Sequence, residues 1–104
     1  MTLVVEVYEI SSRFPAEERF GLTAQCRRAA VSIVANIAEG NARSTRPEYG
    51  RFVSIARASV AELDTELTVA ERIGFATAET LESPRDHADQ IGRMLTILHR
   101  RLAE

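Results

Sequence analysis

Apolar residues along this chain recur mostly three and four positions apart, which is the spacing of one face of an α-helix. Four segments carry this pattern, at about residues 2–13, 23–39, 46–73 and 83–102. No alternating run of β-branched residues bounded by hairpin dipeptides accompanies them. The pattern therefore predicts an all-α protein.

Residues that cap helices mark the ends of the second and third segments. Gly40 is a suitable C-cap residue for the second helix. Thr45, followed three positions later by Glu48, makes a capping box at the start of the third helix. Gly74 is expected to end that helix after about 27 residues, or roughly 40 Å at 1.5 Å per residue.

The fourth helix is predicted to begin within the stretch "ESPRD". Ser83 is placed at its N-cap and Pro84 at its first position, where proline is tolerated. A short separate helical turn is expected at residues 77–81. Because helices joined by short connections pack as antiparallel neighbours, the 104 residues predict an antiparallel up-and-down four-helix bundle, with residues 1–104 forming a single domain.

The second helix carries one narrow line of polar side chains. Placed about 100° apart around the axis, they fall within a sector of about 80°, namely Gln25, Arg28, Ser32, Asn36, Glu39 and Arg43. Almost every other position is apolar, whereas a surface helix of a monomer shows a wide polar face. Met94 and Ile97 also lie off the core stripe of the fourth helix. We therefore predict a homo-oligomer, in which a second copy covers the second helix.

The third helix carries polar residues among its apolar positions. Its apolar face consists of Tyr49, Phe52, Ile55, Ala56, Val60, Leu63, Leu67, Ala70 and Ile73. Ser59 and Glu66 fall inside this face, and Glu62 falls on its edge. A carboxylate there costs several kcal/mol unless it is paired. The available partners are arginines, namely Arg28, Arg43 and Arg57.

We interpret these residues as a polar network that is buried in the bundle or lies at an interface. Its members come from the second and third helices: Arg28, Ser32, Asn36, Glu39, Ser59 and Glu62. The alternative is that the polar line is the solvated face of the second helix. The spacing alone does not decide between the two.

Arginines gather around the turn before the third helix, at Arg43, Arg46, Arg51 and Arg57. Repeated in an oligomer, this turn would present a basic surface to an RNA or DNA backbone, with salt-dependent affinity. The alternative is a solvated loop with scattered ion pairs. The net charge of the whole chain is −2, which disfavours tight nucleic-acid binding.

No pattern indicates an enzyme, a cofactor or a metal site. Ser32 and its polar neighbours lack a nearby histidine base, and a helix interior offers no free N–H for an oxyanion. His87 and His99 are too far apart along one helix to bind one metal ion together. We therefore expect a non-catalytic protein with no cofactor and no small-molecule substrate.

Cysteine usage and hydropathy suggest the cellular setting. The single Cys26 cannot form an internal disulfide, which favours a reducing, cytoplasmic location. The longest uncharged run, residues 29–38, is too short to cross a bilayer. No membrane partner is expected.

Two stretches give the chain a family resemblance. "FPAEERFGLTAQCRRAAVSIVANIAEGNAR", followed by "RFVSIARASVAEL", resembles the 23S rRNA intervening sequence proteins of bacteria. The positions that match the family pattern are Arg27, Arg28, Ser32, Asn36, Glu39, Gly40, Arg43, Phe52, Ala56, Arg57, Ser59 and Glu62. The resemblance implies a four-helix bundle that assembles into a ring-like homopentamer, with no established enzymatic activity.

The resemblance leaves two functions open. The first is a non-catalytic scaffold or macromolecule-binding protein, and the alternative is an RNA- or DNA-binding accessory protein. The alternative follows from a related branch, the accessory proteins of diversity-generating retroelements, which are pentameric, bind nucleic acid and partner a reverse transcriptase. Family members usually have a longer first helix with a tryptophan, so the shorter helix here is expected to expose core or to weaken assembly. Ala58 replaces a usual glycine, and Val34 replaces a usual proline.

Overall fold

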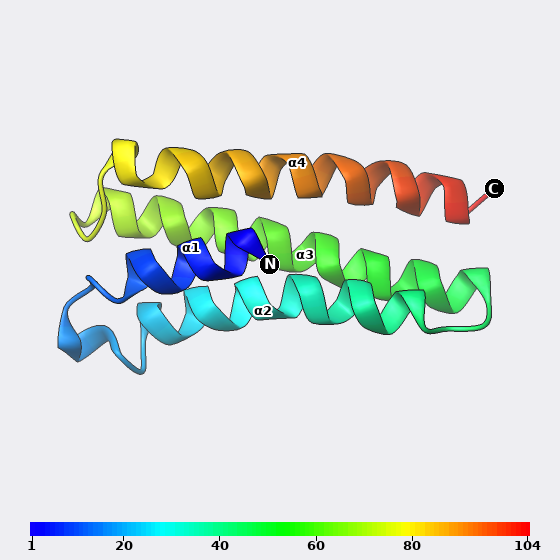
Figure 1. Cartoon of the computed structure of the whole chain (residues 1–104), viewed down its shortest axis with the longest axis horizontal. Coiled ribbons are helices and arrows are strands. Elements are labelled where there is room, and N and C mark those ends of the chain that lie inside the picture. The colour runs from blue at the N-terminus through cyan, green and yellow to red at the C-terminus, as the bar shows by residue number, and fades with distance from the viewer.

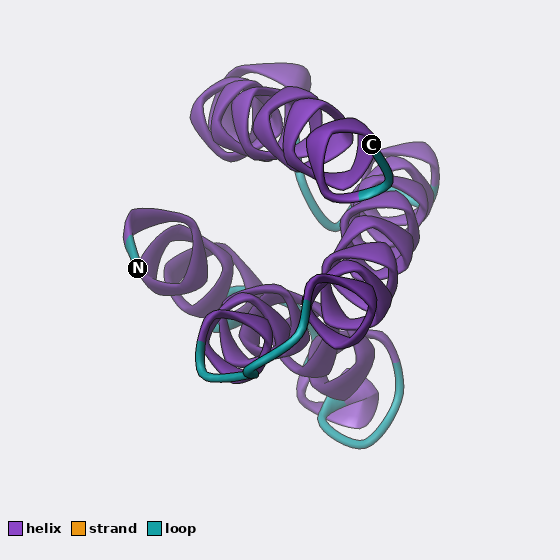
Figure 2. Ribbon diagram, turned by 90° about the vertical axis from the view of Figure 1, so that its right-hand side faces the viewer, coloured by secondary structure: helices purple, strands orange, loops and turns teal.

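Four α-helices and one short 3-10 helix make up the fold (Figure 1). The computed structural model describes residues 1–104. The elements are α1 (Thr2–Ser11), the 3-10 helix η1 (Ala16–Glu18), α2 (Leu22–Asn41), α3 (Arg46–Arg72) and α4 (Ala78–Leu102). Consecutive α-helices run antiparallel, and an end-on view shows them arranged around a common interior (Figure 2). The predicted all-α four-helix bundle is confirmed.

The first helix lies beside only one half of the bundle. The N-terminus is near the middle of the long axis (Figure 1), and α1 contacts α2 and α4. Leu3 and Val7 of α1 belong to a core of twelve buried residues. A second, smaller core of Val53, Ala56 and Leu95 contains no residue of α1. It is bordered by half-buried apolar side chains, so the interior in this half of the bundle is less well shielded from solvent.

The third helix begins and ends as its capping residues predict. Thr45 Oγ1 accepts a hydrogen bond from the Glu48 backbone N–H at 3.3 Å. The helix then continues for 27 residues. Gly74 has a φ of +87° in the turn that follows, a conformation that glycine adopts without steric cost.

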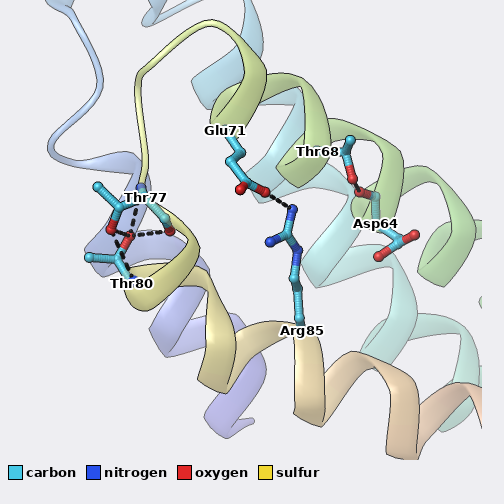
Figure 3. A network of polar contacts seen from close by, with 6 residues as sticks. All are labelled: Asp64, Thr68, Glu71, Thr77, Thr80 and Arg85. Carbon is cyan, nitrogen blue, oxygen red and sulfur yellow. Dashed lines mark hydrogen bonds and ion pairs between the residues drawn. The ribbon is translucent and has the colours of Figure 1, made fainter.

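The predicted start of the fourth helix is wrong. The helix begins at Ala78, because Thr77 and Thr80 form a reciprocal capping box in which each side chain accepts from the other's backbone N–H (Figure 3). The turn expected at residues 77–81 is thus its first turn. The Ser83 hydroxyl caps nothing and donates to Glu6. Pro84 lies inside the helix, where its ring is fully buried.

Gly40 does not cap the second helix. Helix α2 continues to Asn41, and Gly40 is buried against α3. A Cβ at this position would lie 3.0 Å from both Phe52 Cβ and Tyr49 Cδ1. The glycine therefore allows close approach of two helices, a role that its local sequence cannot reveal.

The predicted apolar faces are partly wrong at their edges. Val53, which was not assigned to the face of α3, is fully buried, whereas Ile55 and Ile73 are 39% and 53% exposed. Tyr8 shares the helical spacing of Leu3, Val4 and Val7 and was expected on the apolar face of α1, but it is 43% exposed and stacks under the Arg27 guanidinium at 4.6 Å. The direction of the buried face depends on where neighbouring helices lie, so periodicity places it only approximately.

Substitution of alanine for glycine should have opposite effects at Gly40 and Gly50. We expect Gly40→Ala to lower the free energy of unfolding by about 1 kcal/mol, because crowding outweighs the gain in helix propensity. Gly50→Ala is the matched control. Its Cβ would lie 3.9 Å from Leu102 Cβ, so it should stabilise by about 0.5–1 kcal/mol. Urea unfolding measures both, and equal stabilisation by the two changes would contradict the packing role of Gly40.

Candidate functional site: a polar seam and an arginine-rich end

Three side chains of the predicted network meet where α2 packs on α3. Asn36 Nδ2 lies 3.0 Å from Ser32 Oγ, and Ser32 Oγ lies 2.8 Å from Ser59 Oγ. Ser59 Oγ in turn donates to the Ile55 carbonyl at 3.2 Å. Since Ser59 has one hydroxyl hydrogen, Ser32 is the donor in the bond between the two serines. We call Ser32, Asn36 and Ser59 the polar seam.

The seam is a continuous chain of hydrogen bonds that crosses from one helix to the other. Ser59 is only 6% exposed, and Ser32 and Asn36 are half-buried. Asn36 Nδ2 also donates to the Ser32 carbonyl at 2.8 Å. The hydroxyl groups of both serines each donate once and accept at least once along this chain. The seam therefore satisfies polar groups that would otherwise be costly to bury.

The other three predicted members of the network lie outside this hydrogen-bonded chain. Arg28 and Glu62 are exposed. Glu39 is also exposed, and it pairs with Arg43 one helical turn away at 2.7 Å instead of reaching Ser32. The structure thus brings together Ser32, Asn36 and Ser59 and leaves the charged residues around them.

Glu66 is the group at this face that the predicted network omitted. Its Oε1 is buried and has no hydrogen-bond partner. Burial raises the pKa of the Glu66 carboxyl, and the nearby Glu62 raises it further, while Arg28 lowers it. The sequence signal was available, because Glu66 lies inside the apolar face of α3.

Cys26 lies close enough to Glu66 for the carboxylate charge to affect the Cys26 thiol. The thiol is fully buried, and burial together with Glu66 raises its pKa to about 12. A thiol of this kind is protonated at neutral pH and is a poor nucleophile. Cys26 therefore acts as a core residue.

The predicted arginine cluster is only partly assembled. Arg43 and Arg51 lie over the Phe52 ring, with guanidinium carbons 4.7 and 4.8 Å from its centroid. Arg46 donates to the Arg101 carbonyl at the end of α4. Arg57 lies apart from them and lines a groove between α3 and α4. It is three helical turns along α3 from Arg46, roughly 16 Å at 1.5 Å per residue, so it lies away from this end of the bundle.

Basic residues of α4 join this end of the bundle and were missed. The last turn of α4 contains His99, Arg100 and Arg101. His99 lines one shallow pocket together with Arg46 and Arg51. An antiparallel bundle places the end of α4 beside the start of α3, so the run "HRR" was the signal that could have identified them.

His87 has a structural contact far from this end. Its Nδ1 lies 2.7 Å from Glu6 Oε1, and the same carboxylate accepts from Ser83. These contacts fasten α1 to α4. No group of three or more His, Cys, Asp or Glu side chains is arranged to hold a metal ion. None of the helices combines the length and apolarity needed to cross a membrane.

The fold and its seam define the class as a small all-α four-helix bundle. The family model for 23S rRNA-intervening sequence proteins matches residues 1–97, and the chain belongs to this family. A similar solved structure is a protein of unknown function from the S23 ribosomal protein family of Bacteroides thetaiotaomicron. The two are 25% identical with a TM-score of 0.79, and the match covers 91% of this chain and 87% of that one. No curated protein matches the chain.

Removing the charge of Glu66 should stabilise the isolated chain in a pH-dependent way. A carboxyl whose pKa is raised by folding binds its proton more tightly in the folded state, so stability falls as the pH rises above the usual value of 4.5. We expect Glu66→Gln to unfold at higher urea than wild type at pH 7, with the difference vanishing below about pH 4.

The comparison must be made at protein concentrations low enough to keep the chain monomeric. Glu17→Gln, at an exposed position of η1, is the control and should show little difference at either pH. A Glu66→Gln effect of the same size at both pH values would mean that the charge of Glu66 is not the cause.

Proposed function

We propose that the chain is a non-catalytic, homo-oligomeric scaffold protein that works in the cytoplasm and engages a macromolecular partner. The observation that carries this proposal is the outward face of α2. The polar seam faces α3, whereas Val31, Ala35 and Ala38 are exposed along a line of i, i+4 and i+7 positions. Val31 is 41% exposed. An apolar line of this kind is typical of a helix that packs on a second partner.

Other exposed apolar side chains support assembly. Ile55 and Val69 of α3 are 39% and 42% exposed, and Met94 and Ile97 of α4 are 66% and 50% exposed. These residues surround the bundle on more than one side, as contacts between copies in a ring require. The family resemblance implies five copies, and we propose a homopentamer on that ground. The free thiol of Cys26 is compatible with a reducing cytoplasm.

Assembly can be tested by the solution mass of the protein. The chain has a mass of 11.5 kDa, and light scattering should give a multiple of this value, about five for a pentamer. We expect Ala35→Glu to reduce the mass, because it places a charge in the apolar line of α2. Ala78→Glu, at the exposed first position of α4, is the matched control and should retain the wild-type mass.

Two results would count against assembly. Wild type that remains a monomer at high concentration would exclude it. An Ala35→Glu variant with unchanged mass would mean that the apolar line of α2 is not the contact surface. Circular dichroism of each variant separates loss of assembly from loss of folding.

A second candidate function is nucleic-acid binding at the arginine-rich end. The convergence of Arg46 and Arg51 with the basic last turn of α4 favours it, because guanidinium groups bind phosphate through paired hydrogen bonds. The N-terminus of α3 lies at the same end and adds a partial positive charge. In an oligomer this surface would be repeated in each copy. The ligand would be an RNA or DNA backbone, with no sequence readout implied.

Fluorescence anisotropy with single-stranded and structured RNA tests this candidate. We expect binding that weakens as salt rises. Replacing both Arg46 and Arg51 by glutamine should reduce the slope against salt by about 1 for each lost phosphate contact. Arg13→Gln, at an exposed position in the connection between α1 and α2, is the control. Absence of binding even at low salt would exclude the nucleic-acid function and leave the scaffold function standing.

A further inference from the structure

The outward side of α3 carries an apolar stripe with two carboxylates at its centre. Ile55, Ala58 and Val69 are exposed along this stripe, and Glu62 and Glu66 lie between them. A shallow groove on this side is lined by Leu22 and Gln25 of α2 and by Ala58, Ala61, Glu62, Thr65, Glu66 and Val69 of α3. We call this surface the acidic face. Its apolar residues resemble a contact surface, but its carboxylates require cationic partners.

Within one chain the acidic face is electrostatically incomplete. Glu66 Oε1 is buried without a donor, and none of the ion pairs includes Glu62 or Glu66. Arg28 is the nearby cation, and it is exposed and does not hydrogen-bond to either carboxylate. A guanidinium from outside the chain would supply the missing donors, because arginine presents five N–H groups in a planar fork.

A complementary surface adjoins the acidic face on the same helix, and Ala58 and Ala61 line both. The groove between α3 and α4 is lined by small residues, including Ala58, Ala61 and Gly92, which permit another helix to approach closely. Arg57 lines this groove, is half-buried and takes part in none of the ion pairs of the chain. Ile97, 50% exposed, adds apolar area. We call this surface the basic groove.

The remaining charges of the basic groove leave Arg57 as its available cation. Arg85 is bound to Glu71 at 2.6 Å (Figure 3), and Arg93 is bound to Asp89 at 2.6 Å. Asp64 also lines the groove, two helical turns along α3 from Arg57.

Charge also decides which surfaces of two copies can meet. A two-fold contact between two acidic faces would bring the carboxylates of both copies together, which is unfavourable. A contact between the acidic face of one copy and the basic groove of another pairs opposite charges. Both surfaces border α3 and are not on opposite sides of the bundle. Each contact therefore turns the direction of assembly, which favours a closed ring over a straight filament.

We propose that Glu62 and Glu66 of one copy bind Arg57 in the basic groove of the next copy, in a head-to-tail contact repeated around a ring. This inference rests on the proposed homo-oligomer and identifies the surfaces that form it. Arg57 of the neighbouring copy supplies the hydrogen-bond donor that the buried Glu66 carboxylate lacks within its own chain. The apolar residues beside the charges exclude water from the contact and strengthen the ion pair.

Exchanging the two charges tests the contact. Arg57→Glu and Glu66→Arg should each weaken association by about 100-fold or more, measured by light scattering over a dilution series. A chain that carries both substitutions should regain association, because opposite charges again face each other. If circular dichroism shows Glu66→Arg to be unfolded, Glu62→Arg at the adjacent exposed position takes its place, alone and combined with Arg57→Glu.

Two charge reversals outside both surfaces serve as controls. Arg13→Glu and Glu17→Arg change exposed residues before α2 and should keep the wild-type mass. The inference is overturned if the folded single variants keep the wild-type mass, or if the combined variant stays dissociated. If wild type is oligomeric, either of these results rules out this contact but does not affect the proposed assembly. A monomeric wild type would instead overturn the assembly itself, so the two failures are distinguishable.

Discussion

The close packing of α2 on α3 is the constraint on which the rest of the structure depends. Gly40 of α2 lets the two backbones approach, because a Cβ there would lie 3.0 Å from Phe52 Cβ and Tyr49 Cδ1 of α3. The hydrogen bonds of Ser32, Asn36 and Ser59 then fix how the two helices are aligned, because an unpaired hydroxyl there would be costly.

This alignment determines what each helix presents to solvent. Once the polar seam faces α3, the exposed side of α2 that carries Val31, Ala35 and Ala38 is left apolar, and the acidic face of α3 lies beside the seam. The short α1 covers only part of the remaining interior, fastened by the contacts of Glu6 with Ser83 and His87. A bundle of 104 residues with so many apolar side chains outside its core is well suited to association. The proposed scaffold function and the proposed ring contact both follow from this one alignment.

The polar line on α2 shows how far sequence reasoning reaches into the candidate site. Its residues were identified from helical spacing, and two of them, Ser32 and Asn36, form a hydrogen-bonded chain with Ser59 of α3. Glu39 did not join, because Arg43 is one turn away and offers a local partner that needs no other helix. Arg57 was assigned to the arginine-rich end because it is near Arg51 in sequence, but the rotation of α3 directs it into the α3–α4 groove. Spacing along a helix gives direction around its axis and says nothing of which neighbour lies there.

The sequence by itself determined the features that depend on neighbours within one or two turns. These include the helical class, the cap at Thr45, the length of α3 and the turn at Gly74, since local hydrogen bonds and backbone preference decide each of them. Only the tertiary structure decided the role of Gly40, the start of α4 ahead of Pro84 and the meeting of Arg46 with the end of α4. Each of these depends on atoms that are distant in the chain, or on two local signals whose competition is settled by packing.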